Sequence, residues 1–421
     1  MAARPDLDVW LYGTLVATLT DAGDGRIRMR WTSAAADRWP INSTVLSVLL
    51  PLAPSQAPAP MRVRAFFAGL MPEGDARVHL AVEAGVEPDD VFGMMTAYGR
   101  DVAGALVLQP HGTTPDDQAG RLRPIGDAEI RRRLELADSN DAPLGVVAGV
   151  TSISLAGMQP KIALHRALDG RWMECLDGAA STHIIKPGRP QGSEASDLID
   201  NEAYCLKLAR ELGLTTVSDA VEEFDGRRAL VVSRYDRKVT AEGVARVHQE
   251  DCAQMLGLNT DDPLRKFQYG RSTPSLRQIA QVLDREYAPR QPLLALTVFN
   301  VAVGNTDAHA KNLSVLHLEN GDLELAPAYD LSPHRHYARS GRRSAMDVND
   351  GYDIDALTAA DLVAEAESWG LGQDVATAVV QDTLEGLRAA LAAGRHEVSE
   401  RALTVMTQRT QRLLDRDSAG D

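Results

Sequence analysis

The chain has 421 residues, which is more than one ordinary hydrophobic core supports, so we expect two or three domains or lobes. Its composition, 44% hydrophobic and 24% charged, is typical of a soluble globular protein. The net charge of −15 argues against a large surface that binds nucleic-acid phosphates. It does not exclude a local basic patch or DNA binding through a partner.

The cysteines and the apolar segments indicate the compartment. Cys175, Cys205 and Cys252 form no CxxC pair and have no histidine cluster at zinc-ligand spacing, so we expect buried free thiols in a reducing compartment. The N-terminus has no basic-then-apolar signal, and the longest apolar stretch, 293–303, is too short to cross a bilayer. The sequence therefore predicts a cytoplasmic protein that does not enter a membrane.

Residues 1–110 form the first predicted unit, a small mixture of strands and helices. Polar and apolar residues alternate over 26–31, which fits a half-buried strand. The segment 61–81 has a helical pattern, but Pro72 lacks a backbone donor and should interrupt the helix.

Residues 111–149 are predicted to be a linker and a helix. The stretch 110–124 is rich in Pro, Gly and charged residues, which favours a linker. A short helix follows over 127–136 and carries Arg131–Arg133. Consecutive arginines on a helix usually form a solvated face, and we prefer that interpretation to a phosphate site.

Two contrasting regions complete the chain. Residues 150–235 contain short β-type runs around a single helix at 201–212, whereas the chain after residue 245 is mainly helical apart from one hairpin near 313–328. Strands with one helix that lead into a helical second half indicate a bilobal α+β enzyme. The β-type runs cover 153–155, 161–165, 183–186 and 228–233, and the last three helices cover 358–369, 373–393 and 398–415.

The most informative stretch of the sequence is 304–312. Asp307 and Asn312 have the Asp-x-x-x-x-Asn spacing of a kinase catalytic loop, in which the Asp accepts the proton of the substrate hydroxyl and the Asn binds a metal ion. The spacing alone is a weak signal, because both residue types are common in loops.

The hairpin that follows strengthens this interpretation. Its turn is signalled by Asn320-Gly321, and a pairing of residue 318 with residue 323 would place residue 312 opposite residue 329. Asn312 and Asp330 would then meet at the open end of the hairpin, where their oxygens could share a Mg²⁺ ion that bridges ATP phosphates. The alternative is that Asp330 only caps the turn at 331–333.

Other residues are candidates for contacting phosphates. Lys186 ends a strand-like run, and Glu202 lies near the start of the next helix, so the two could form the Lys–Glu pair of kinases. Glu202 could equally complement the helix dipole, and both interpretations stay open. The turn around Gly157 lacks Walker A spacing and fits better as a short turn over phosphates.

Several runs in chain order resemble the HipA family of serine/threonine kinases, and the block 307–312 is the most diagnostic of them. Two N-terminal runs, at 12–13 and 66–74, are similar to the N-terminal subdomain of the family, so the resemblance covers nearly the whole chain. The other matching runs are 153–161, 182–186, 201–205, 234–237, 249–251 and 329–330.

The resemblance implies a bilobal protein-kinase-like fold with an additional N-terminal α/β subdomain. Residues 1–110 would be that subdomain, 111–149 a linker and helix, 150–236 a nucleotide-binding lobe and 237–421 a mostly helical catalytic lobe.

The resemblance also implies roles for individual residues. Asp307 would be the catalytic base, and Asn312 and Asp330 would hold Mg²⁺. Ser154 would be an autophosphorylation switch, with Ser152 as a rival site. ATP would be bound by phosphate contacts from Ala156, Gly157, Met158, Gln159, Lys161 and Lys186, by an adenine-facing hinge at Ser233 and Tyr235, and by His309, Lys311, Asn312, Tyr329 and Asp330 in and after the catalytic loop.

The function implied is that of a toxin kinase that transfers the ATP γ-phosphate to a protein serine or threonine. Known targets of the family include aminoacyl-tRNA synthetases, and a small DNA-binding HipB-like antitoxin would be the partner through which the chain reaches DNA. Two alternatives stay open: a nucleotide-binding co-repressor with weak catalysis, and a small-molecule phosphotransferase.

Overall fold

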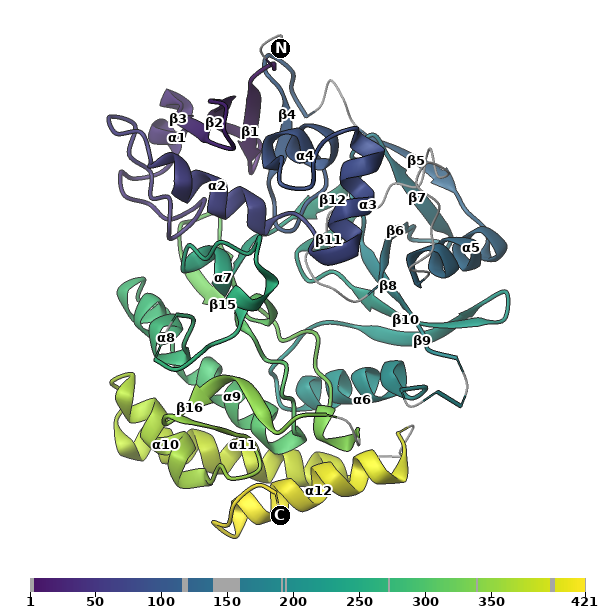
Figure 1. The fold of residues 1–421 in the computed structure, drawn as a ribbon, viewed down its shortest axis with the longest axis vertical. Coiled ribbons are helices and arrows are strands. Elements are labelled where there is room, and N and C mark those ends of the chain that lie inside the picture. The colour runs from purple at the N-terminus through teal and green to yellow at the C-terminus, as the bar shows by residue number, and fades with distance from the viewer. Residues whose placement is uncertain are drawn as a thin grey trace.

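The computed structural model describes residues 4–115, 120–138, 160–190, 192–193, 195–271, 273–337, 340–393 and 398–420. Figure 1 shows an N-terminal unit and a sheet-rich lobe at one end of the molecule and a helical bundle at the other. Helices are mixed with sheets whose strand pairs are all antiparallel, which confirms the predicted α+β class. The predicted run 153–155 and the turn residues Ala156, Gly157, Met158 and Gln159 lie outside the described residues. The boundaries between the four predicted segments stay predictions.

The N-terminal unit has its own hydrophobic core, which includes Phe66 and Phe67 and extends from Leu7 to Leu108. The predicted strand at 26–31 is confirmed, since residues 27–31 alternate between buried and exposed. The predicted interruption at Pro72 is also confirmed, because one helix ends at Gly69 and the next begins at Gly74. The sheet order is β3-β2-β1-β4, built from β1 (Leu7–Leu11), β2 (Thr14–Asp21), β3 (Ile27–Trp31) and β4 (Val107–Pro110), and the helices are α1 (Ser33–Arg38), α2 (Pro60–Gly69), α3 (Gly74–Ala84) and α4 (Val91–Tyr98).

A six-stranded sheet forms the core of the first lobe, and helices α5 (Asp127–Asp138) and α6 (Leu198–Glu211) pack against it. The three predicted runs that lie in the described residues are confirmed as β6, β8 and β10. The strand order is β5-β7-β6-β8-β10-β9, from β5 (Arg121–Pro124), β6 (Ile162–Arg166), β7 (Trp172–Leu176), β8 (His183–Pro187), β9 (Asp219–Phe224) and β10 (Arg227–Ser233).

Two predictions about the segment before this lobe were wrong in part. Residues 121–124 are not linker but the edge strand β5, which pairs with β7; all four residues are exposed, so they carry no apolar pattern that the sequence could reveal. Arg131 and Arg132 do form a solvated face, but Arg133 is buried and its Nη2 donates to Glu174 Oε1 at 2.5 Å.

The second lobe is mainly helical, as predicted, and its last three helices match the expected ranges closely. The prediction of a single hairpin after residue 245 was wrong, because a third strand joins that hairpin and a second hairpin follows it. The helices are α7 (Cys252–Met255), α8 (Leu276–Arg285), α9 (Gln291–Val303), α10 (Ala359–Ser368), α11 (Gln373–Ala393) and α12 (Glu400–Leu414), with short 3₁₀ turns η1 (Pro263–Lys266), η2 (Ala310–Asn312) and η3 (His334–His336). The strands are β11 (Arg237–Thr240) paired with β12 (Gly243–Arg246), β13 (His248–Asp251) with β14 (Ser314–His317) and β15 (Leu323–Leu325), and β16 (Arg343–Val348) with β17 (Gly351–Asp353).

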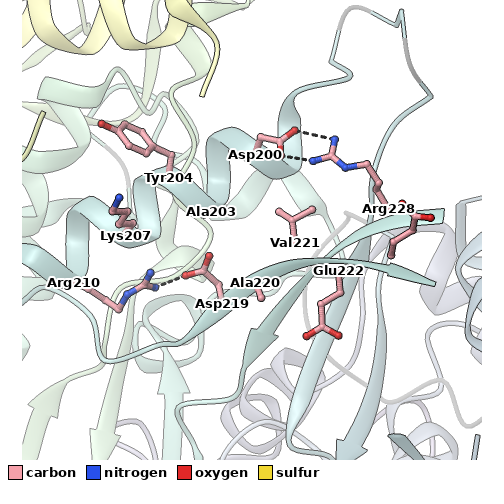
Figure 2. Close-up of a pocket in the computed structure, with 11 residues that line it drawn as sticks. Asp200, Ala203, Tyr204, Lys207, Arg210, Asp219, Ala220, Val221, Glu222 and Arg228 are labelled. Carbon is pink, nitrogen blue, oxygen red and sulfur yellow. Dashed lines mark hydrogen bonds and ion pairs between the residues drawn. The ribbon is translucent and has the colours of Figure 1, made fainter. Parts of the chain in front are cut away.

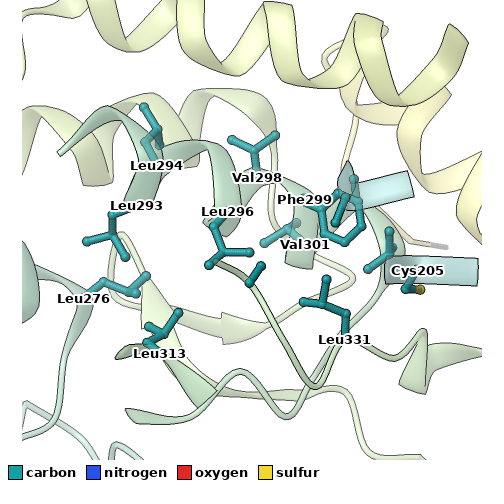
Figure 3. Packing of buried hydrophobic residues seen from close by; sticks show 14 of the residues in the cluster. Cys205, Leu276, Leu293, Leu294, Leu296, Val298, Phe299, Val301, Leu313 and Leu331 are labelled. Carbon is teal, nitrogen blue, oxygen red and sulfur yellow. The ribbon is translucent and has the colours of Figure 1, made fainter. Parts of the chain in front are cut away.

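Helix α9 is the centre of this lobe. It is apolar on every side, which is the pattern of a helix enclosed by others, and α10, α11 and α12 pack around it. Figure 3 shows its side chains, among them Leu296 and Phe299, packed with Leu331 and with Cys205 of α6. This contact fixes the first lobe on the second and places the loop after α9 beside α6.

Two further expectations can be compared with the structure. Cys175, Cys205 and Cys252 are all buried free thiols, as predicted. Among the described residues, no helix is long and apolar enough to cross a membrane.

Candidate active site

A cavity of about 360 Å³ lies between the two lobes. It brings together β8 and α6 of the first lobe, the loop after α9, and the segment that follows β15. Every predicted nucleotide-site residue in the described part of the chain lines it: Lys161, Lys186, Ser233, Tyr235, Asp307, His309, Lys311, Asn312, Tyr329 and Asp330.

Lys186 on β8 lines this cavity and makes two ion pairs there. Its Nζ lies 2.6 Å from Glu202 Oε1 on α6 and 2.5 Å from Asp330 Oδ1, so one ammonium bridges two carboxylates. The Lys186–Glu202 pair, which the sequence left open, is therefore formed. Burial disfavours the charged form of Lys186, but the two carboxylates outweigh burial and raise its pKa.

Asp330 is held in an unusual conformation. Its φ of +57° lies in the left-handed region, where a short polar side chain such as Asp is better tolerated than a bulky one. Burial acts to raise its pKa, but the cations of Lys186 and Lys161 outweigh burial and hold the pKa well below its usual range. Asp330 is therefore a permanent anion whose side chain keeps about a third of its surface accessible.

The catalytic-loop segment starts where α9 ends. Gly304 ends the helix in the left-handed region at φ +78°, a conformation that favours glycine. Asn305 Oδ1 then accepts from the backbone N–H of Asp307 at 3.1 Å, and Asn312 Nδ2 donates to the backbone carbonyl of Asp307 at 2.9 Å. The loop is thus closed on Asp307 from both sides, which fixes the direction of that residue.

The Asp307 carboxyl itself has no hydrogen-bond or ion-pair partner among the described residues. Burial raises its pKa to about 6, with Asp330 adding to the rise and Lys266 opposing it. An acid tuned close to neutral pH, directed into a cavity and without a fixed partner, has the properties of a general base.

The hairpin register differs from the predicted one by a single residue. His317 pairs with Leu323, and Leu318 N–H donates to the carbonyl of Asp322, so the turn contains three residues. Gly321 has a φ of +94°, which fits a three-residue turn that ends in a left-handed residue and not the two-residue turn expected. Asn312 and Asp330 nevertheless line the same cavity.

Tyrosines line the predicted adenine end of the cavity. The rings of Tyr235 and Tyr329 lie 5.7 Å apart, and Tyr329 Oη contacts Ser314 Oγ at 2.6 Å and donates to the Lys311 carbonyl at 2.8 Å. Tyr235 donates to Gln249, and Ser233 Oγ accepts from the N–H of Ser218 at 2.8 Å. These bonds fix the wall that would face a flat ring.

The remaining lysines and the histidine differ in how they are held. Lys161 starts the approach to β6, and burial lowers its pKa to about 8, with Asp330 opposing the fall. Lys311 Nζ is already bound, to Asp251 Oδ2 at 3.0 Å and to the Gly69 carbonyl at 3.2 Å. The buried Nδ1 of His309 has no hydrogen-bond partner in the described part of the chain, and burial lowers the pKa of this histidine to about 3.

Lys266, at the end of η1, lines the cavity and was not identified from the sequence. It stands in a surface-like run of charged residues with no motif around it, so only its burial in the fold marks it. Ser152, Ser154 and the turn residues 156–159 lie outside the described residues, so their roles stay predictions.

A second cavity, of about 550 Å³, lies between α6 and β9 and is lined by none of the predicted site residues that the structure describes (Figure 2). Its charges are largely paired across the groove: Asp200 with Arg228 at 2.6 Å, and Asp219 with Arg210. Because these acids have fixed arginine partners, whereas the Asp307 carboxyl has no partner among the described residues, the inter-lobe cavity is the better candidate for chemistry.

Comparison with known proteins agrees with this assignment. Residues 7–109 match the family model of the HipA N-terminal domain, and residues 153–391 match that of the HipA-like C-terminal domain. The putative kinase Y4mE of Sinorhizobium fredii is 33% identical over 87% of this chain and 86% of its own length. The serine/threonine-protein kinase toxin HipA of Shewanella oneidensis is 30% identical over 75% of this chain and 73% of its own.

The fold has a solved counterpart. HipA of Shewanella oneidensis, determined in a complex with HipB and its operator DNA, superposes with a TM-score of 0.78 and 25% identity, covering 97% of this chain and 96% of that one. This match confirms the predicted bilobal kinase-like fold with its additional N-terminal subdomain. Two family models, relatives named as kinases and a shared architecture lead to one conclusion: the chain belongs to the HipA family of kinases.

Proposed function

We propose that the protein is an ATP- and Mg²⁺-dependent serine/threonine protein kinase that acts as the toxin of a toxin–antitoxin pair. The observation that carries the proposal is the double ion pair of Lys186 with Glu202 and Asp330, inside the cavity that Asp307 and Asn312 also line. A strand lysine bound to a helix glutamate is the arrangement that orients the α- and β-phosphates in kinases.

The reacting group would lie next to Asp307. A substrate hydroxyl oxygen forms a bond to the γ-phosphorus while the bond between that phosphorus and the leaving ADP oxygen breaks, and the hydroxyl proton passes to the Asp307 carboxylate. With a pKa of about 6, Asp307 is mostly ionised at neutral pH and is also basic enough to accept a proton. Lys186 and Lys161 would bind and orient the phosphates.

The residues fit a magnesium site. Mg²⁺ prefers carboxylate and carbonyl oxygens, and Asp330 is a permanent anion that lines the same cavity as the amide of Asn312. Those two residues would hold the ion, which supplies positive charge to the β- and γ-phosphate oxygens when it is bound.

A small DNA-binding protein is the proposed partner. The Shewanella HipA relative was solved together with HipB and operator DNA. The net charge of −15 on this chain disfavours tight binding to DNA on its own, so DNA contact would come through the partner.

Ser154 is the proposed autophosphorylation switch, with Ser152 as the rival site. A phosphoserine adds about −1.5 to −2 charges at neutral pH, and beside a phosphate site that charge should repel nucleotide. Mass spectrometry after incubation with Mg²⁺ and ATP should find the phosphate on Ser154. Full activity of protein that is stoichiometrically phosphorylated there would refute the switch but not the kinase.

Incubation of the protein with a host lysate and ATP labelled on the γ-phosphate tests the main proposal. We expect label on protein serine or threonine, dependent on Mg²⁺ and lost in Lys186→Met. Label only on a metabolite would identify a small-molecule phosphotransferase. ATP binding without transfer to any acceptor would identify a nucleotide-binding co-repressor.

A further inference from the structure

The N-terminal unit reaches the catalytic cavity at Gly69 and Ala103, and the loop between α2 and α3 that follows Gly69 carries a buried carboxylate. Glu73, the last residue before α3, is 4% exposed although it belongs to a different unit from the catalytic loop. Its Oε2 accepts from Lys266 Nζ at 2.8 Å, and its Oε1 lies 3.7 Å from Lys311 Nζ. One carboxylate of the N-terminal unit therefore lies between two lysines that line the catalytic cavity.

A second set of contacts joins the end of α2 to the same part of the second lobe. Lys311 donates to the carbonyl of Gly69 at the end of α2, where the helix dipole places partial negative charge. Gln254 donates to the Phe66 carbonyl at 2.8 Å, and Lys311 also binds Asp251, which caps α7 together with Gln254. A Cβ at Gly69 would stand 2.2 Å from Gln254 Cγ, so the two units approach closely enough here to require glycine.

These contacts bear on the reacting groups. Lys266 and Lys311 line the same cavity as Asp307. The ring of Phe267, the residue after Lys266, stands edge-on to His309 at 5.1 Å. Moving Lys266 would therefore change both the cations around Asp307 and the packing of His309.

We propose that Glu73 is a positioning residue of the active site, through which the N-terminal unit holds Lys266 and Lys311 in place around Asp307. The proposal rests on the kinase function proposed above and adds to it that the N-terminal unit is a working part of the catalytic centre. Buried ammonium groups need a fixed counter-charge, because removing one partner of a buried ion pair leaves an uncompensated charge, which is strongly destabilising. A displacement of about 1 Å at a catalytic group can cost on the order of 100-fold in rate.

The experiment measures kcat, KM for ATP and the melting temperature for the full-length chain and two sets of variants. Glu73→Gln keeps the shape and one acceptor for Lys266 but removes the anion. We expect a fall in kcat of about tenfold or more with KM for ATP little changed, because the lysines near Asp307 then lose their fixed counter-charge. Lys266→Met should lower kcat similarly, and Lys266→Arg should return kcat toward that of the wild type.

Two control variants separate positioning from general stability. Glu87→Gln makes the same chemical change at an exposed site on the N-terminal unit. Glu174→Gln breaks a buried ion pair with Arg133 in another part of the molecule. Neither should lower kcat, even where Glu174→Gln lowers the melting temperature.

The outcomes distinguish this inference from the proposed function. An active wild type whose kcat is unchanged in both Glu73→Gln and Lys266→Met would overturn the positioning role and leave the kinase assignment standing. A lower kcat at unchanged KM for ATP in both variants supports it. If Glu73→Gln fails to fold, the contrast between Lys266→Met and Lys266→Arg still decides. A wild type without any phosphate transfer overturns both.

Discussion

Two buried charge clusters border the catalytic cavity and are built on different principles. In the first, Arg234 binds Asp236 through Nε at 3.0 Å and Nη2 at 2.8 Å, and Arg237 binds Asp101 at 2.9 Å. The backbone carbonyls of Val102 and Gly104 accept further guanidinium bonds. This arginine cluster joins the N-terminal unit to the first lobe, and of its guanidinium nitrogens only Arg237 Nε is buried without a partner in the described residues.

The second cluster consists of Lys186, Glu202, Asp330 and Asp307 in the inter-lobe cavity, and its charges have fewer partners. Lys186 is shared between Glu202 and Asp330, and the carboxyl of Asp307 has no partner in the described part of the chain. The pKa values diverge accordingly. Burial acts to raise the pKa of Asp236, but Arg234 and Arg237 hold it well below its usual range, whereas burial and Asp330 raise that of Asp307 to about 6. Charges with full sets of partners join domains, and charges with partial sets remain available for chemistry.

The largest effect is expected for Asp307→Asn. The amide cannot accept the hydroxyl proton, so the rate of phosphate transfer should fall on the order of 10²- to 10⁴-fold. Because the wild-type carboxyl is buried without a partner, its loss should leave stability unchanged or slightly higher. Single-turnover transfer and thermal melts measure the two properties, and near-normal transfer in this variant would contradict the role of Asp307.

The matched change in the arginine cluster should do the opposite. Asp236→Asn leaves Arg234 and Arg237 with an uncompensated buried charge, which typically costs about 3–5 kcal/mol. We expect a lower urea midpoint, with transfer kinetics close to normal in the fraction that stays folded. A variant with unchanged stability and lost activity would break the comparison between the two clusters.

Asp330→Ala tests whether the incomplete cluster holds metal. The variant removes the anion proposed to bind Mg²⁺ and should weaken the affinity for Mg²⁺·ATP about tenfold or more, since metal-ion charge stabilisation is worth several kcal/mol. Titration calorimetry with and without Mg²⁺ measures the change. If affinity and rate stay the same, Asp330 serves only the turn that follows it.

The pH dependence of kcat/KM tests the role of Asp307. Below a pH of about 6 the Asp307 carboxyl is protonated and cannot act as a base, so kcat/KM should fall about tenfold per pH unit on the acid side. The sign follows from the raised pKa: activity is present above it and is lost as pH falls through it. The acid limb should be absent from the residual activity of Asp307→Asn.

The smallest effect is expected in the groove between α6 and β9. Asp200 and Arg228 form a partly exposed ion pair, and such pairs contribute about 0–1 kcal/mol. Asp200→Asn should therefore leave activity unchanged and lower stability only slightly. A large loss of transfer would show that this groove influences catalysis through α6 and that the inter-lobe cavity is not the only one important for the reaction.

Much of the site could be predicted from the sequence because its signals are local. Three features are each encoded by a few neighbouring residues: the spacing of Asp307 and Asn312, the strand that contains Lys186, and the turn at Asn320-Gly321. The last three helices follow from apolar periodicity. The family resemblance then assigned roles to residues whose positions in the cavity the structure supports.

Non-local pairing and burial were decided by the tertiary structure alone. Strand β5 has no apolar face and exists because β7 offers it an edge, and the hairpin register depends on a three-residue turn that Asn-Gly by itself does not specify. Whether Glu202 meets Lys186, and whether Lys266 is a surface lysine or a cavity cation, depends on which elements pack together. The sequence by itself determined which residues could do chemistry, and only the fold decided which charges have partners, because electrostatic environment is a property of neighbours that are distant in the chain.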